Sequence, residues 1–244
     1  MITAHRLHQL WRALPIGTLD DLIGIGSCLI LAPHPDDESL GCGGLIAACC
    51  AESRWPAVVI LTDGSRSHTH SRLFPPTRLA TLREEEVKKA VRILGLPPDR
   101  LILLHEPDAE APRAGPRFDD IVQRLSGYVR ALKCSAIVAT WDLDPHGDHQ
   151  SAAAIASKVA RTTDIRLLSY PIWGWILSED IPTDETRIRG WRLDVTAYLD
   201  AKRSAIAAHA SQYGRLITDD PAGFHLPVKL LQTFDSPWET FLLP

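Results

Sequence analysis

Residues 29 to 44 are Leu29-Ile-Leu-Ala-Pro-His34-Pro-Asp36-Asp37-Glu38-Ser-Leu-Gly41-Cys-Gly-Gly44, and they decide how the rest of the chain is interpreted. The apolar run at the start predicts a central parallel strand that is covered on both faces. Two prolines then flank His34 and favour an extended turn at the carboxyl end of that strand. The glycines let the backbone pass close to a site, and we expect a helix to begin near Leu45.

Three carboxylates follow His34, at Asp36, Asp37 and Glu38. Like charges this close together are costly unless a positive group lies between them, and a divalent metal ion is the simplest such group. His34 and Asp37 offer the nitrogen and oxygen ligands that zinc accepts at about 2.0 to 2.2 Å. Asp36 then remains free to act as a general base on the attacking water. The alternative is an ordinary solvated acidic turn, which has no need of a histidine held between prolines.

Composition and charge limit the class of protein. The chain has 244 residues, of which 45% are hydrophobic, enough for the core of a single α/β domain over 1–244. The net charge of −4 and the pI near 6.2 argue against a nucleic-acid binder that uses a basic face. Residues 1–12 lack the apolar core of a signal peptide, and no apolar stretch approaches the roughly 20 residues that span a bilayer, so we expect a cytoplasmic protein without a transmembrane segment. The five cysteines form no Cys-x-x-Cys pair, which predicts reduced thiols.

Apolar strands alternate with amphipathic helices along most of the sequence. This alternation predicts a Rossmann-like three-layer α/β/α fold with a mostly parallel sheet of five or more strands. We expect residues 1–26 to form a lead-in helix that packs on the sheet. Residues 191–195 are expected to form an edge strand, and residues 215–244 a segment that covers the sheet near the site.

A second polar cluster, residues 141–150, follows the strand expected at 136–140. Ligand sites of open parallel sheets lie outside the carboxyl ends of the strands, so this cluster should reach the same edge as His34. His149 would then complete a metal site with His34 and Asp37. Three protein ligands with a position left open for water are typical of catalytic zinc sites, although Fe²⁺ or another divalent metal also fits such a set.

His146 lies three residues before His149 and would stay uncoordinated. Asp148 could hold a ring nitrogen of His146 and raise its basicity, so that the imidazole is protonated near neutral pH. Taken alone, two histidines at this spacing could equally be surface residues that cap a helix starting near Ser151.

The segment His34-Pro-Asp-Asp-Glu38, after a hydrophobic strand and before glycines, resembles the signature of the LmbE-like, or PIG-L, N-acetylglucosaminide deacetylases. The likeness runs from about residue 28 to 214. The family carries His-Pro-Asp-His where this chain has His146-Gly-Asp-His149, and Asp144-Pro145 stands in place of a tyrosine-containing lead found in some members. The resemblance implies a zinc-dependent N-deacetylase.

The same resemblance implies substrate contacts. Arg83, in the helix expected over residues 77–94, matches an arginine that reaches the substrate in the family. The alternative is a surface ion pair of Arg83 with Glu85 or Glu86. Asp108, at the exit of the next strand, falls where family members often place an acceptor for a sugar hydroxyl.

Two further groups have open interpretations. The polar loop 65–71 contains His68 and His70, which could be additional metal ligands, substrate contacts or solvated histidines. Trp173 and Trp175 could stack on a sugar face, or they could pack in the core, which is the more frequent use of tryptophan.

Two classes of function remain open. In the first, a metal-dependent hydrolase removes the N-acetyl group from an N-acetylglucosamine-type sugar of a small-molecule or lipid-linked conjugate. Asp36 would take the proton of water, and His146, oriented by Asp148, would stabilise the oxyanion or protonate the departing amine. The second is a non-catalytic sugar-binding or regulatory protein, which needs neither Asp36 nor His146 in a free state. A metal phosphoesterase would more often hold two ions about 3.5 to 4 Å apart. The sequence is compatible with a homo-oligomer but does not specify one.

Overall fold

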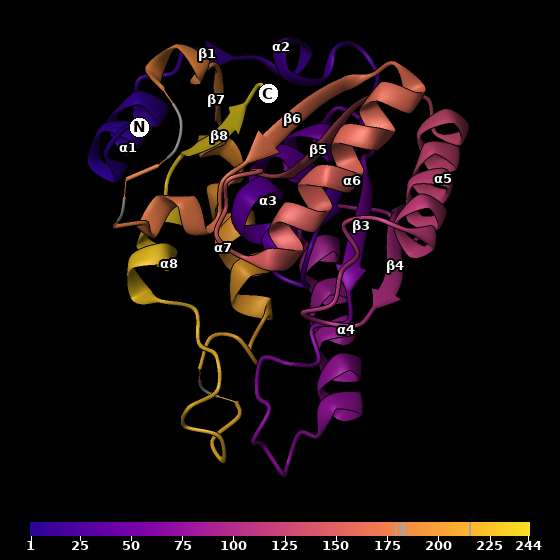
Figure 1. The fold of residues 1–244 in the computed structure, drawn as a ribbon, viewed down its shortest axis with the longest axis vertical. Helices are drawn as coiled ribbons and strands as arrows, with labels where there is room; N and C mark the ends of the chain where they lie inside the picture. The colour runs from indigo at the N-terminus through magenta and orange to yellow at the C-terminus, as the bar shows by residue number, and fades with distance from the viewer. Residues whose placement is uncertain (179, 182–183, 215) are drawn as a thin grey trace.

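An eight-stranded sheet forms the centre of the molecule in the computed structural model, which describes residues 1–178, 180–181, 184–214 and 216–244 (Figure 1). Its strands are β1 (Ile16–Gly17), β2 (Ser27–Ala32), β3 (Ala57–Thr62), β4 (Leu101–Glu106), β5 (Cys134–Thr140), β6 (Arg166–Tyr170), β7 (Gly190–Asp194) and β8 (Trp238–Leu242). They lie in the order β1-β7-β8-β6-β5-β2-β3-β4, and every neighbouring pair is parallel except the two that contain β8. The mostly parallel sheet predicted from the sequence is confirmed.

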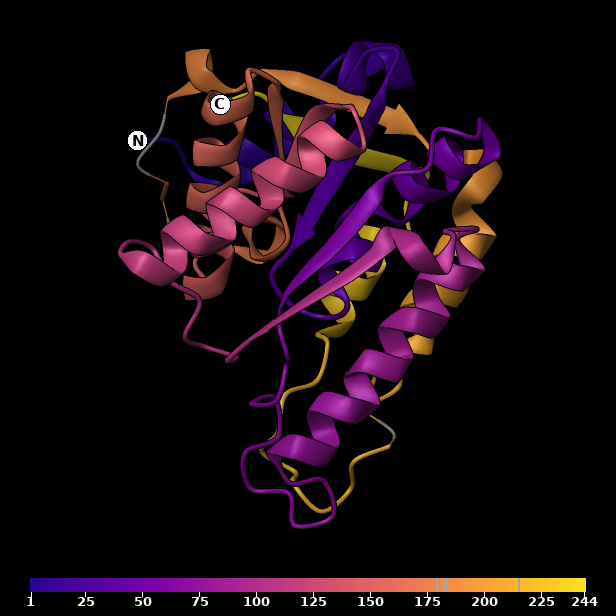
Figure 2. The same cartoon turned by 90° about the vertical axis from the view of Figure 1, so that its right-hand side faces the viewer.

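Helices cover both faces of this sheet (Figures 1 and 2). They are α1 (Ala4–Arg12), α2 (Leu19–Ile23), α3 (Asp37–Ala51), α4 (Pro76–Ile93), α5 (Pro116–Ala131), α6 (Gly147–Thr163), α7 (Leu199–Ala208) and α8 (Val228–Phe234), with the short 3-10 helices η1 (Pro98–Arg100), η2 (Trp173–Ile176), η3 (Glu185–Arg187) and η4 (Thr196–Tyr198). Successive side chains of a strand point to opposite faces. Ile30 of β2 belongs to the core cluster shared with α3, α4 and α7, whereas Leu29 and Leu31 belong to the cluster shared with α5 and α6. The three-layer α/β/α fold is therefore confirmed.

Helix α3 begins at Asp37, earlier than the expected start near Leu45, so the glycines lie inside the helix. A Cβ atom on Gly41 would lie 2.2 Å from Tyr170 Cδ2, and one on Gly44 would lie 2.3 Å from Val195 Cγ1. The glycines therefore let α3 pack closely against the sheet instead of forming a loop. As a result, the carboxylates of the first cluster lie at the N-terminus of a buried helix.

The C-terminal segment is part of the sheet as well as a cover. Strand β8 lies between β6 and β7 and is antiparallel to both, and α8 precedes it. Strand β7 is consequently an interior strand, so the expectation of an edge strand at residues 191–195 was wrong. The edge is formed by the two-residue strand β1, which residues 1–26 contribute together with α1 and α2.

Two loops distant in sequence, residues 63–75 and 216–226, extend side by side from one end of the molecule (Figures 1 and 2). We call these two loops the lobe. Asp219 accepts hydrogen bonds from the backbone N–H groups of Arg72 and Leu73 at 2.8 and 2.9 Å, and the Phe224 N–H donates to the Ser67 carbonyl at 2.7 Å. The lobe borders the site described below.

Two expectations about the whole chain can be compared with the structure. Among the described residues, no helix is both long and apolar enough to cross a membrane. All five cysteines are free thiols, as their number and spacing predicted.

Candidate active site

A cavity of about 230 Å³ lies at the carboxyl ends of the central strands. Side chains that follow β2 to β6, together with others from α4, α8, the lobe and the segment after α7, line it: His34, Asp36, Asp37, Leu40, Arg66, Ser67, Arg83, Asp108, Ala109, His146, His149, Ile172, Trp173, Gln212, Phe224, Leu226 and Leu230. Strands β2 and β5 are adjacent and parallel, so the two polar clusters that follow them meet at this cavity.

Asp37 lies between two imidazoles. One of its oxygens, Oδ2, is 3.2 Å from His34 Nδ1 and 3.3 Å from His149 Nε2, and it also accepts the His34 backbone N–H at 3.0 Å. Both ring nitrogens of His149 are buried and have no hydrogen-bond partner of good geometry, and Nε2, which faces Asp37, is available to an ion. The three residues predicted as metal ligands are thus brought together.

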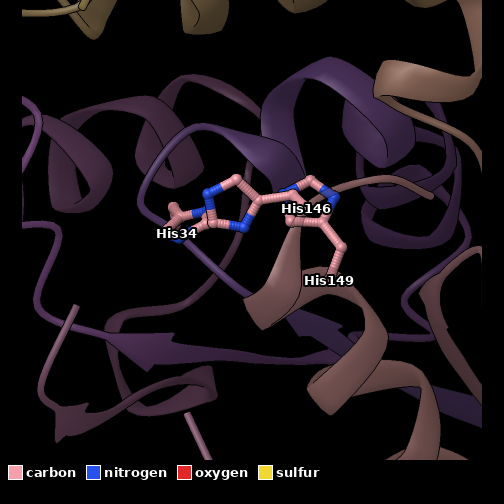
Figure 3. Close-up of side chains that lie close together, drawn as sticks. All are labelled: His34, His146 and His149. Atoms are coloured by element: carbon pink, nitrogen blue, oxygen red, sulfur yellow. The ribbon is translucent and has the colours of Figure 1, made fainter. Parts of the chain in front are cut away.

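Figure 3 shows the rings of His34, His146 and His149 close together. Ligand atoms of these three residues lie within 4.8 Å of one another, and so do those of His34, Asp108 and Asp148. Neither group is the predicted set of His34, Asp37 and His149. The choice of His146 or Asp37 as the third ligand therefore remains a prediction that metal binding by variants can decide.

The charges around the two predicted histidine ligands shift their titration. Burial alone would lower the pKa of His34, but hydrogen bonds with Asp108, Asp148 and Asp37 raise it well above its usual value. Burial also opposes protonation of His149, yet the nearby carboxylates raise its pKa to about 9. In turn, His149 and His34 outweigh the effect of burial on Asp37 and hold the pKa of that carboxyl well below its usual range. The negative charge of these carboxylates favours a positive charge at the site, either as protons on the rings or as a bound cation.

Asp36 has different surroundings from its neighbour. Its backbone has φ of 151°, in a region that residues other than glycine rarely adopt, at a cost of order 1–3 kcal/mol. Burial raises the pKa of Asp36 to about 6, with repulsion from Asp37 adding to the shift and Arg83 opposing it. A buried carboxyl that titrates near neutrality, lines the cavity and makes no ligand contact to the histidines has the properties of a general base.

Arg83 holds this region in place. It is only 3% exposed, and its guanidinium donates to the Pro35 carbonyl at 2.8 Å and to the Gly64 carbonyl at 3.1 Å, with Nη2 3.3 Å from Asp36 Oδ2. A surface ion pair with Glu85 or Glu86 is therefore excluded. Arg83 and Asp108 both line the cavity, so their predicted contact with a substrate remains open to test.

The expected contact between the Asp148 carboxylate and His146 is wrong. Asp148 Oδ2 lies 3.1 Å from His34 Nε2, and the carboxylate accepts the backbone N–H groups of Ala109 and Ala111 at 2.8 and 3.1 Å. Helix α6 starts at Gly147, so Asp148 is in its first turn and turns away from His146. Asp148 instead orients His34 and fixes the loop after β4.

His146 consequently differs from the expected cationic acid. The backbone N–H of Asp148 donates to His146 Nδ1 at 3.2 Å, which places the proton of the neutral ring on Nε2. Burial lowers the pKa of His146, and the neighbouring His34 and His149 lower it further. The imidazole is therefore arranged as a neutral N–H donor toward the cavity.

Two site residues were not identified from the sequence. Asp144 is fully buried, with Oδ1 3.3 Å from His149 Nδ1 and Oδ2 accepting the backbone N–H of Trp173 at 2.9 Å. It thus stands behind a candidate ligand and also holds the start of η2. Gln212 lines the cavity, donates to Ser67 Oγ at 3.2 Å and leaves its buried Oε1 without a partner. The available signals were the position of Asp144 before His149 and, for Gln212, its place within the stretch 28–214 that resembles the family.

The structure gives different outcomes for the remaining predictions about histidine and tryptophan side chains. His68 is only 1% exposed and its ring lies 5.5 Å from that of His225, so it is not a solvated histidine, and it does not line the cavity. Trp173 lines the cavity. Trp175 packs against Trp11, with 4.8 Å between the ring centroids.

These features define a class of protein: an α/β fold whose strand ends hold a histidine and aspartate cluster suited to a metal ion, with a separate buried carboxyl group, that of Asp36. Sequence comparison makes the assignment specific. The chain belongs to the PIG-L family, described as GlcNAc-PI de-N-acetylase, whose family model matches residues 29–160.

Several similar proteins are named as deacetylases. The chain is 26% identical to a probable N-acetyl-alpha-D-glucosaminyl L-malate deacetylase 2 of Bacillus anthracis, over 78% of this chain and 83% of the relative. It is 27% identical to a 1D-myo-inositol 2-acetamido-2-deoxy-alpha-D-glucopyranoside deacetylase of Corynebacterium diphtheriae, over 79% and 78%. Among solved structures, an N,N'-diacetylchitobiose deacetylase from Pyrococcus horikoshii superposes with a TM-score of 0.67 at 18% identity, covering 98% of this chain and 92% of that one, which supports the fold.

Proposed function

We propose that this protein is a metal-dependent N-deacetylase that hydrolyses the acetamide of an N-acetylglucosamine-type sugar and releases acetate and a free amine. The observation that carries the proposal is that the adjacent residues Asp36 and Asp37 have different surroundings. One carboxylate lies between two imidazoles, whereas its neighbour in sequence lines the same cavity with a pKa of about 6. Hydrolysis assisted by a metal needs both a ligand and a base.

The residues fit a divalent ion. The orphaned Nε2 of His149 and the oxygen of Asp37 that approaches both imidazoles supply nitrogen and oxygen donors. We propose His34, Asp37 and His149 as the ligands, with zinc, iron(II) or another divalent metal as the ion. When bound, the ion would supply Lewis acidity toward the amide carbonyl.

The other roles follow from the contacts of the chain. Asp36, held by Arg83, accepts the proton of the attacking water. The Nε2–H of neutral His146 donates a hydrogen bond to the developing oxyanion, and the proton that Asp36 took from water passes to the departing amine. Asp148 and Asp144 position His34 and His149, because each carboxylate approaches the side of a ring that does not face Asp37. Arg83, Asp108 and Gln212 are the groups available to a sugar hydroxyl.

The test is a screen for amine release over N-acetylated glucosaminides. Activity is expected on at least one glucosaminide, with loss on chelation, recovery on addition of zinc or iron(II), and one ion per chain. Phosphate esters serve as the comparison, because a two-ion phosphoesterase would prefer them. Phosphatase activity without amide cleavage, or binding of these sugars without turnover by the metal-loaded protein, would refute the proposal.

A further inference from the structure

The backbone of Asp36 needs support because its conformation is unfavourable. Its φ of 151° lies in a region that residues other than glycine rarely adopt, and such strain persists only where surrounding contacts hold it. The Asp36 carbonyl accepts the N–H groups of Ser39 and Leu40 at 3.1 and 2.9 Å, within the first turn of α3. The φ angle describes rotation about the N–Cα bond, so holding it also requires a contact on the N–H side.

The side chain of Glu38 makes this second contact. Its Oε2 accepts the Asp36 N–H at 3.0 Å, and the side chain is fully buried. A buried carboxylate is costly unless donors satisfy its other oxygen as well. Ser39 Oγ donates to Oε1 at 2.6 Å, and the Nε2 of His209 lies 3.0 Å from the same oxygen. Because an ionised carboxylate can only accept, His209 is the donor in this pair.

His209 is fully buried and comes from the segment that directly follows α7. This segment is fixed independently of Glu38, because the N–H and Oγ of Ser211 donate to Glu86 of α4 at 2.7 and 2.6 Å. His209 is therefore a donor mounted on a rigid part of the fold. Neither Glu38 nor His209 is among the residues that line the cavity, so neither is placed to touch a substrate.

We propose that Glu38 and His209 are positioning residues, which hold the N–H of Asp36 and so keep its carboxyl group directed into the cavity as the base. This inference rests on the proposed function, in which Asp36 accepts the proton of water. Arg83 approaches the carboxyl group of Asp36, whereas the Glu38–His209 pair holds the backbone. Without the pair, Asp36 can relax to a more favourable φ angle, and a displacement of its carboxyl group by about 1 Å can lower turnover about 10²-fold.

The experiment compares two variants of His209. His209→Leu removes the donor, whereas His209→Gln restores an amide N–H near the former position of Nε2. Amine release is measured with the metal-loaded proteins on a glucosaminide that the wild type cleaves. His209→Leu should lower kcat about 10²-fold without changing KM or bound metal, and His209→Gln should recover most of this loss. Wild-type kcat in His209→Leu would overturn the inference and leave the proposed function intact, whereas a wild-type protein that cleaves no glucosaminide would count against the function itself.

A double-mutant cycle separates positioning from general damage to the fold. In the Asp36→Asn background the base is absent, so adding His209→Leu should lower turnover no further. An equal further loss in that background would refute a role that acts through Asp36. If His209→Leu does not fold, His209→Asn takes its place, because its shorter side chain carries the amide near the former Nδ1 instead of Nε2.

Ser211→Ala is the control for disturbance of the segment after α7. Ser211 is buried two residues from His209, but its side chain donates to Glu86 and makes no hydrogen bond with Glu38 or Asp36. This variant should therefore keep kcat near the wild-type value. A loss of kcat in Ser211→Ala as large as that in His209→Leu would mean that the whole segment, and not the contact with Glu38, supports turnover.

Discussion

Asp36 and Asp37 are adjacent, yet their different surroundings predict different roles for them. Asp36→Asn keeps the shape of the side chain but cannot accept a proton, so turnover should fall by about 10² to 10⁴ while bound metal stays near normal. Asp37→Asn should lose metal, because its oxygen approaches both His34 and His149. Metal content after dialysis and amine release measure the two effects. If Asp36→Asn lost metal and Asp37→Asn kept it, the two roles would have to be exchanged.

The titration of Asp36 predicts the acid side of the pH profile. A general base works only when deprotonated, so the rate should fall as the pH drops through the pKa of Asp36. Burial raises this pKa to about 6 without an ion, and a nearby cation lowers it, so the limb should lie at or below pH 6. The lowered pKa of His146 means that its neutral form dominates at pH 7, so this residue should add no alkaline limb. A kcat/KM profile in wild type and His146→Ala tests both statements.

His146 and His149 decide between the two sets of candidate ligands. His149→Ala should lose metal, because both of its ring nitrogens are buried without a hydrogen-bond partner. His146→Ala should retain a full equivalent, because the Nδ1 of that ring already accepts the Asp148 N–H. Metal titration of both variants provides the comparison. Loss of metal in His146→Ala and retention in His149→Ala would show that the predicted set is wrong.

The sequence alone was sufficient to predict that these side chains lie close together. Adjacent parallel strands must deliver their exits to one edge, and His34 and His149 follow two such strands. The direction of a side chain was harder to predict. Asp148 turned to His34 because α6 starts at Gly147, and Gln212 lies at the cavity beside Ser67, a residue of the lobe that is distant in sequence. Such contacts depend on tertiary structure, which cannot be predicted from local sequence patterns.

At the scale of elements, continuous apolar runs identified the buried strands, but the final strand was missed. Strand β8 contains Glu239, which is buried, so its sequence lacks the apolar continuity of β2. The partners of the Glu239 carboxylate explain why it can be buried. It accepts the N–H groups of Gly44 and Leu45 in α3 at 2.7 and 2.8 Å, and it lies 2.8 Å from the Nζ of buried Lys202 in α7. One side chain thus joins β8 to two helices of the same layer.

This junction predicts a large effect on stability. Glu239→Ala leaves the ammonium of Lys202 buried without a counterion, and such truncations cost about 3–5 kcal/mol of unfolding free energy. Asp235→Ala is the control, because its pair with Arg203 is about half exposed and should contribute no more than about 1 kcal/mol. Urea unfolding of both variants gives the difference. Similar losses in the two variants would mean that the buried pair does not hold β8 in the sheet.

At the scale of the whole molecule, the charge of the site couples metal binding to pH and stability. Without an ion, the surrounding carboxylates favour the protonated rings: they raise the pKa of His34 above its usual value and that of His149 to about 9. Binding of an ion through these nitrogens must displace any protons that they carry. Calorimetry in two buffers of different ionisation enthalpy should therefore show proton release on metal binding at pH 7. Release of no protons would contradict the ligand assignment.

The same raised pKa values set the sign of a stability change. A histidine whose folded pKa exceeds its unfolded value stabilises the metal-free fold below the unfolded pKa, and that contribution is lost as the pH rises through the folded pKa, about 9 for His149. The Tm of chelated protein should therefore fall between about pH 6.5 and 9. The metal-bound fold needs neutral rings, so the increase in Tm on adding metal should grow over this window. Thermal unfolding with and without metal measures the difference, with His149→Ala as the control that should show little increase at any pH. A metal-induced increase in wild type that stays constant from pH 6.5 to 9 would mean that these histidines do not carry the protons that the ion replaces.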